Sequence, residues 1–153
     1  MTNSVFPAAA LKPYCLKLSP ADDLKLSLRS FVESSAIAAG CILTTVGSLQ
    51  QVSLRFAGQD SATVLTGRFE IVSLVGTLSL EGLHLHMAIA DGQGQTLGGH
   101  VMPGCLIYTT AEIVVGIMSG LSFQRRWDNR TGYRELAIAD ERSLDVSPTV
   151  IDG

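Results

Sequence analysis

All three histidines of the chain, His84, His86 and His100, lie between positions 84 and 100. Neutral imidazole is a ligand for zinc, iron, copper, nickel and cobalt, and three protein ligands leave a coordination position for water or a substrate. The grouping therefore predicts one metal site with these residues as its ligands. The residues alone equally allow three unrelated histidines, two on a polar sheet face and one in a loop.

The residues around the histidines predict how they meet. From position 83 to 90 apolar and other side chains alternate, so one strand places His84 and His86 on the same face. A turn-rich segment at 91–95 follows, and a hairpin centred on Gln93 sets His86 opposite His100. Directly paired residues have Cβ atoms about 4.5 to 5.5 Å apart, so the three rings are expected to converge.

Glu112 is a further candidate for the site. It follows Thr109, Thr110 and Ala111 beside an apolar strand. A carboxylate there is a possible fourth ligand, a partner that orients a ligand, or a base for proton transfer. The alternative is an exposed strand residue or half of an ion pair with an arginine. Cys105, in an apolar strand, is assigned to the core.

Composition and charge limit the classes of function. The chain of 153 residues has a net charge of -3, which disfavours nonspecific binding of nucleic acid. One basic cluster, at 125–134, is diluted by Asp128 and Glu135 and is expected to be a solvated or ion-paired face. We find no membrane span, signal peptide, phosphate-binding loop or dinucleotide fingerprint. Three cysteines without a paired spacing favour reduced thiols and the cytoplasm.

The hydrophobic periodicity predicts an α+β domain over residues 1–139, with one main helix on a largely antiparallel sheet. Ser19 as N-cap, Pro20 as first helical residue and Gly40 as stop predict a helix over 20–38, with an apolar stripe on one side. The acidic segment 140–153 is expected to be a loosely ordered tail. Strands are expected at 14–18, 42–46, 51–56, 69–80, 83–90 and 105–118.

Several segments resemble one known family, the plants-and-prokaryotes conserved (PPC) domain in its stand-alone prokaryotic form. The segments are Gly67–Leu74, Leu83–His86, Gly98–His100 and Thr109–Ile113, with Phe123, Arg125, Asp128 and Thr131–Tyr133 near the end. The resemblance implies a helix on an antiparallel sheet, assembly into homotrimers, and a metal bound by His84, His86 and His100. We expect one divalent metal per chain, with zinc ahead of iron, cobalt and nickel.

The resemblance also bears on partners. In plants the domain follows an AT-hook that contacts DNA, and prokaryotic members are often labelled as DNA-binding; this chain carries no AT-hook. The family links the segment that contains Arg68 and Glu70 to protein contacts, and from their spacing we expect an ion pair or an interface role. Three functions remain open: a metal-dependent catalytic or small-molecule-binding protein, a DNA-associated or transcription-partner module, and a structural trimer.

Overall fold

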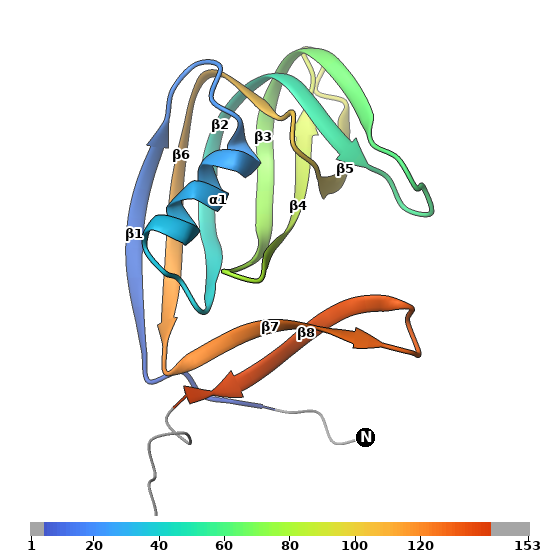
Figure 1. Ribbon diagram of the computed structural model, residues 1–153. Coiled ribbons are helices and arrows are strands. Elements are labelled where there is room, and N and C mark those ends of the chain that lie inside the picture. Colours follow the sequence, from blue (N-terminus) through green and yellow to red (C-terminus); the bar gives the residue numbers. More distant parts are fainter. Residues whose placement is uncertain (1–4, 142–153) are drawn as a thin grey trace, which may run out of the picture.

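The computed structural model describes residues 5–141, which form a mostly antiparallel β-structure with a single helix (Figure 1). Of the predicted tail, residues 142–153 lie outside the described part. The elements are β1 (Ala10–Leu18), α1 (Leu24–Ser34), β2 (Gly40–Arg55), β3 (Thr63–Ser79), β4 (Gly82–Ala90), β5 (Thr96–Val101), β6 (Leu106–Ser119), β7 (Leu121–Asp128) and β8 (Tyr133–Asp140). The predicted order of a strand, a helix and a series of strands is confirmed.

Six strands form one sheet in the order β1-β6-β2-β3-β4-β5, and every pairing in it is antiparallel. The far end of β2 also pairs with β5, through Leu54 with Val101 and Arg55 with His100. This extra pairing curls the sheet back on itself. As a result the strand that carries His100 has neighbours on both sides.

Helix α1 lies across one face of the curved sheet, as Figure 1 shows. Its stripe of Leu24, Leu28 and Val32 is completely buried, and these residues share one core with apolar residues of the strands. Burial of a leucine or valine side chain stabilises a fold by about 1.5–3 kcal/mol. The stripe that the periodicity predicted therefore fixes the helix on the sheet. Within the described part of the chain, no helix has the length and apolar character that crossing a membrane requires.

The predicted bounds of the helix were wrong at both ends. Ala21 has a φ of 70°, which no α-helix accommodates, and the Asp22 amide donates to the Ser19 carbonyl oxygen across a turn. The helix begins at Leu24 instead, because the Asp23 carboxylate accepts a hydrogen bond from the amide of Leu26 at 3.0 Å. At the other end it stops at Ser34, and Gly40 opens β2 rather than closing the helix.

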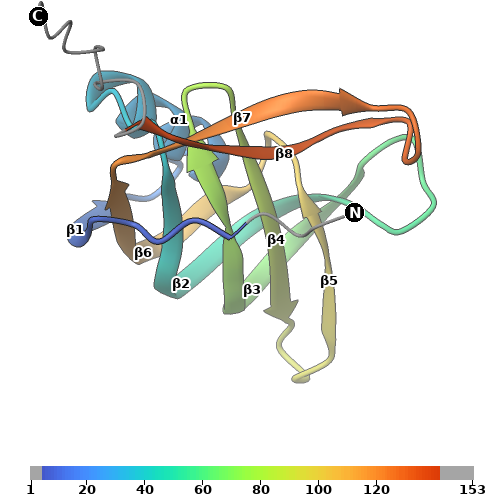
Figure 2. The ribbon, with the colours of Figure 1, turned by 90° about the horizontal axis from the view of Figure 1, so that it is seen from below.

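Two further differences concern the strands. The segments predicted at 42–46 and 51–56 belong to one strand, β2, which continues through Gly47 at a φ of 155°. In addition, no strand was predicted at 121–140, where β7 and β8 form a separate antiparallel hairpin. Figures 1 and 2 show this hairpin lying across the end of the sheet where β3 turns into β4. Residues of the β7–β8 hairpin thereby come to line one cleft together with the histidines.

A candidate metal centre in a polar cleft

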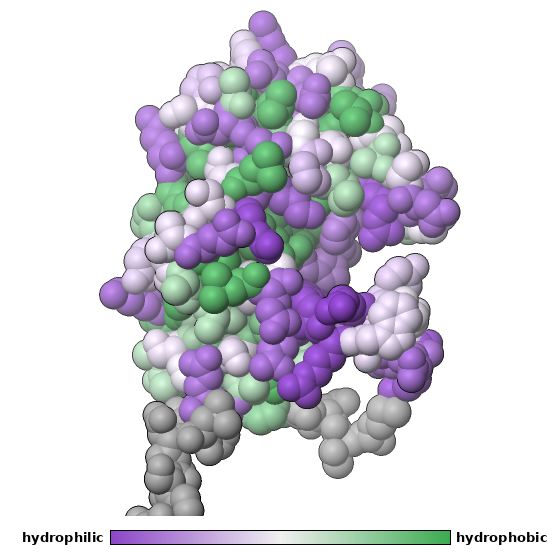
Figure 3. All heavy atoms as spheres, viewed as in Figure 1, coloured by the Kyte–Doolittle hydropathy of each residue, from purple (hydrophilic) through white to green (hydrophobic). Residues whose placement is uncertain are grey.

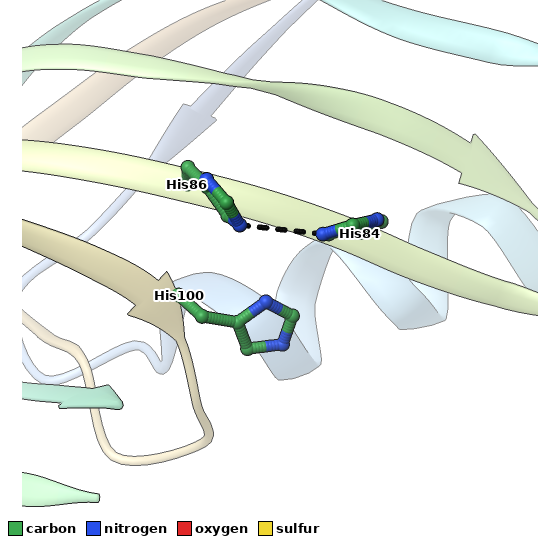
Figure 4. A group of neighbouring side chains, drawn as sticks. All are labelled: His84, His86 and His100. Carbon is green, nitrogen blue, oxygen red and sulfur yellow. Dashed lines mark hydrogen bonds between the residues drawn. The ribbon is translucent and has the colours of Figure 1, made fainter. Parts of the chain in front are cut away.

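The three histidines converge on one face of the β4–β5 hairpin. His84 and His86 alternate along β4 with Leu85 and Met87, which are buried in the core on the other face. His86 is the direct partner of His100 in the register of the hairpin, as the sequence predicted. Figure 4 shows the three rings gathered beside the two strands. The centroids of the rings lie 5.1, 5.2 and 5.5 Å apart.

These separations fit a shared metal ion. The Nε2 atoms of His84 and His86 lie 3.3 Å apart, and one ring nitrogen from each of the three histidines falls within 4.8 Å of the others. Zinc bound to imidazole at 2.0–2.1 Å in tetrahedral geometry separates two nitrogens by about 3.3–3.4 Å. The pair on β4 already has this spacing, and ring rotation can bring the third nitrogen closer. The residues present therefore fit a divalent transition metal.

The surroundings of His84 and His100 favour the neutral imidazole, which is the form that binds a metal. Burial lowers the pKa of His84, and the nearby Arg125 lowers it further. Burial also lowers the pKa of His100 to about 4, with a second contribution from the positive charge of Lys25. The Lys25 ammonium donates to the carbonyl oxygen of Val101 at 2.6 Å, so α1 holds a cation close to the strand of His100.

The histidines open into a cleft of about 550 Å³ between the sheet and the β7–β8 hairpin. In the space-filling view the surface is hollowed between the body of the molecule and the hairpin, and hydrophilic residues border the hollow (Figure 3). Besides the histidines, the walls are formed by Arg55, Glu81, Gly82, Leu83, Arg125, Tyr133, Arg134 and Glu135. A metal held by three histidines there would still be reachable by a small ligand.

Arg125 and Arg134 belong to the basic cluster that the sequence analysis assigned to a solvated or ion-paired face. Arg134 is exposed, as expected, whereas Arg125 is half-buried, and both line the cleft. A signal for Arg125 was present in the sequence: Leu121, Phe123 and Arg125 alternate along one strand, and the first two are buried. Arg125 therefore points in the same direction as two core residues. The position of the hairpin over the histidines has no comparable local signal.

Glu112 does not lie in the cleft with the histidines. It is exposed on β6, opposite Lys17 of β1 and Val46 of β2. Together with Cys15 these residues line a separate and more apolar pocket of about 410 Å³, which contains none of the histidines. Within one chain the structure therefore does not bring Glu112 to the metal ligands. Cys105 is completely buried, as expected for a core residue.

Arg68 and Glu70 are both exposed on β3. The guanidinium of Arg68 lies over the ring of Tyr108, 4.9 Å from its centroid, a cation–π contact. Glu70 pairs across the sheet with Ser48 and Ala90. Although the two side chains have opposite charges, no ion pair joins Arg68 to Glu70 in the described part of the chain.

The fold and the histidine cleft define a small α+β domain with a candidate metal centre. A family model, Plants and Prokaryotes Conserved (PCC) domain, matches residues 6–119, and the chain belongs to this family. The family is the PPC family named above. Its match ends with the last residue of β6, so the β7–β8 hairpin lies beyond it.

Among curated proteins, the chain is 46% identical over 142 residues to the bifunctional protein GlmU of Synechococcus sp. strain JA-3-3Ab, covering 93% of this chain and 22% of the relative. The chain thus spans about a fifth of that protein's length. It is also 30% identical over 123 residues to AT-hook motif nuclear-localized protein 20 of Arabidopsis thaliana, covering 76% of this chain and 43% of the relative.

Among solved structures, a hypothetical protein from Salmonella enterica superposes with a TM-score of 0.86 at 44% identity, over 88% of this chain and 97% of the other. A metal-containing protein from Archaeoglobus fulgidus gives a TM-score of 0.77 at 24% identity, over 88% and 99%. A protein from Bacteroides thetaiotaomicron, for which DNA binding has been suggested, gives 0.70 at 19% identity, over 89% and 100%. The same role has been suggested for a Ralstonia eutropha protein at 18% identity and a TM-score of 0.68, over 82% and 90%. At identities below 25% the likeness concerns the fold.

Proposed function

We propose that this protein binds one divalent transition metal per chain through His84, His86 and His100 and uses it to bind or transform a small molecule. Zinc is the first choice, with iron, cobalt or nickel as alternatives, because these ions accept neutral imidazole. The observation that carries the proposal is the convergence of all three histidines in one open cleft. The relative from Archaeoglobus fulgidus, described as metal-containing, supports it.

The three-histidine ligand set favours a catalytic or ligand-binding metal site over a purely structural one. Structural zinc sites are closed by four protein ligands and commonly use cysteine, whereas three histidines leave a position for water or a substrate. A metal ion held by the three histidines would polarise an oxygen bound at the open position or lower the pKa of a water molecule bound there. The chain's own contribution is to fix the imidazoles by strand pairing and to shape the cleft with the hairpin.

A titration with cobalt tests both parts of the proposal. Metal-free protein is titrated with Co²⁺, and the visible absorption spectrum is followed for the wild type and for His86→Ala. We expect one ion per wild-type chain, and affinity at least about 100-fold lower in the variant with an unchanged circular dichroism spectrum. Added azide should then shift the spectrum of the wild type, because it enters an open coordination position. A spectrum that azide leaves unchanged would favour a closed, structural metal.

We propose further that the protein is a homotrimer in the cytoplasm. Strands β2 and β3 expose large apolar side chains, including Val46, Val72 and Val75, each more than half exposed at 59%, 57% and 56%. Such side chains are typical of a surface that is covered in an assembly. The cysteines at 15, 41 and 105 are free thiols, which suits a reducing compartment. Analytical ultracentrifugation is expected to give three times the mass of one chain, and a monomer would contradict the proposal.

A second candidate function is a DNA-associated or transcription-partner module. Two observations favour it: the arginines gathered on the β7–β8 hairpin, and the DNA-binding role suggested for the structural neighbours from Bacteroides and Ralstonia. The net charge of -3 and the direction of Arg125 and Arg134 into the cleft oppose it. The test is retention of duplex DNA between 50 and 200 mM salt, where phosphate contacts lose affinity steeply. Retention that disappears with salt and with Arg126→Gln would establish this second function.

A further inference from the structure

The walls of the cleft carry more positive than negative side chains. The positive side chains are those of Arg55, Arg125 and Arg134, and the negative ones are those of Glu81 and Glu135. The neighbouring Lys25 adds a positive charge near His100 from the side of α1. A divalent ion on the histidines would make the excess of positive charge larger still.

Arg55 and Arg125 flank the histidines from two different strands. Arg55 ends β2 and is the direct partner of His100 in the register of β2 and β5. Arg125 comes from β7, and its guanidinium donates to the hydroxyl oxygen of Thr77 at 2.9 Å. Thr77 is in turn the partner of His84 in the register of β3 and β4. Each arginine is therefore fixed next to a strand that carries a metal ligand.

Neither guanidinium has a carboxylate as partner among residues 5–141. Arg55 donates to the carbonyl oxygen of Gln59 at 3.2 Å, and Arg125 donates to the neutral Thr77. Glu81 accepts a hydrogen bond from the backbone amide of Arg125 at 2.7 Å and not from its guanidinium. A guanidinium has five N–H donors, so most of them remain available in each case.

Both arginines are half-buried. A cation that is partly removed from water without a carboxylate paired directly to it is costly, and an anion that binds to its free N–H groups offsets the cost. Guanidinium groups also match the paired oxygens of carboxylates and phosphates in a planar, bidentate geometry. The structure thus favours an occupant of the cleft that carries both negative charge and several oxygens.

We propose that the cleft binds a small oxyanion, a carboxylate or a phosphate, with one oxygen on the histidine-bound metal and other oxygens on Arg55 and Arg125. The proposal rests on the metal function proposed above and names the chemical class of its ligand. The volume of about 550 Å³ suits a small metabolite. Tyr133, which is 67% exposed on β8, adds a hydroxyl group to the same cleft.

The test is isothermal titration calorimetry with two probes, malonate for the carboxylate class and inorganic phosphate for the phosphate class. Each is titrated into zinc-loaded and metal-free samples of the wild type, Arg55→Gln, Arg125→Gln and Arg126→Gln. Arg126 is a matched control, because it neighbours Arg125 on β7 but is exposed and donates to the side-chain oxygen of Gln124 at 2.7 Å. Whichever probe binds more tightly identifies the source of the oxyanion.

We expect one anion per zinc-loaded wild-type chain, affinity weakened about tenfold or more by Arg55→Gln and Arg125→Gln, and no change with Arg126→Gln. Two results would overturn the anion proposal and leave the metal function standing, provided that zinc binds normally. Either neither anion binds, or all three variants bind the anion as tightly as the wild type. Anion binding that depends on the two arginines while zinc fails to bind would have the opposite meaning. It would support the anion site and overturn the proposed metal function.

Discussion

His86 lies directly opposite His100 in the ladder of β4 and β5. The two rings stand nearly perpendicular to each other, at 76°, with their centroids 5.5 Å apart. Because strand pairing sets this relationship, the site depends on the backbones of β3, β4 and β5 as much as on the ligands themselves.

Gly76 is the residue at which the backbone of β3 should matter most. Its φ of 152° is rare for other residues, and a Cβ there would overlap the carbonyl oxygen of His84. We expect Gly76→Ala to lower the free energy of unfolding by about 2–4 kcal/mol. It should also weaken metal binding although no ligand is removed, because β4 must shift.

Chemical denaturation and metal titration of Gly76→Ala measure these two effects. Gly92→Ala is the control, since a Cβ at Gly92 meets no atom within 4 Å. Stability and metal affinity equal to those of the wild type in Gly76→Ala would show that the contact between β3 and β4 does not position His84.

The lowered pKa of His100 predicts how the metal-free protein responds to acid. In the unfolded chain its pKa returns to 6.5, whereas in the folded chain burial and Lys25 hold it at about 4. Between these values the unfolded state binds more protons, so stability is full above pH 6.5 and falls as the pH drops toward 4. A shift of this size in a fully buried group corresponds to about 3 kcal/mol, and for the half-buried His100 we expect about 1–2 kcal/mol.

Urea denaturation of metal-free protein at pH 7.5 and pH 4.5 measures this dependence. His100→Gln, which cannot titrate, should lose about 1–2 kcal/mol less than the wild type over the same interval. Other charges face His100, from Lys25 on α1, Arg55 on β2 and the two histidines of β4, and they are present in both proteins. Equal losses in the two proteins would show that His100 titrates normally in the folded state.

Asp23 is predicted to link the helix to the sheet. One carboxylate oxygen caps α1 through Leu26, and the other accepts from the amide of Gly104 at 2.6 Å, just before β6. We expect Asp23→Ala to cost about 1–3 kcal/mol, because both hydrogen bonds are lost. Ser19→Ala, at the N-cap that the sequence had suggested, should change the free energy of unfolding by less than about 0.5 kcal/mol. Thermal denaturation of both variants compares the two caps, and a larger effect at Ser19 would contradict the structure.

The parts of the fold that the sequence predicted are those set by local rules. The two-residue period of β4 and one short turn are enough to place His86 opposite His100, and both can be read from neighbouring residues. The helix stripe was predicted for the same reason. Its start was not, because Ser19 and Pro20 suit a helix N-terminus and also a turn with a positive φ at the next residue, here Ala21.

The parts that the sequence did not predict depend on contacts distant in the chain. Gly47 fell between the strands predicted at 42–46 and 51–56, yet β2 runs through it, and the absence of a side chain there leaves room for the carbonyl oxygen of Thr110 on β6. Arg125 appeared as part of a solvated cluster, and only the packing of the hairpin brings it to Thr77, 48 positions earlier. Glu112 appeared as a possible ligand, and the strand order places it in another pocket.

The metal content of the protein tests the central claim most directly. Wild type and His84→Ala are purified without a nickel column, and the metal per chain is measured by elemental analysis. We predict close to one divalent ion per wild-type chain and its loss in His84→Ala with the fold retained. No metal in the wild type, even after incubation with zinc, iron, cobalt and nickel, would contradict the claim and favour a metal-free interaction module.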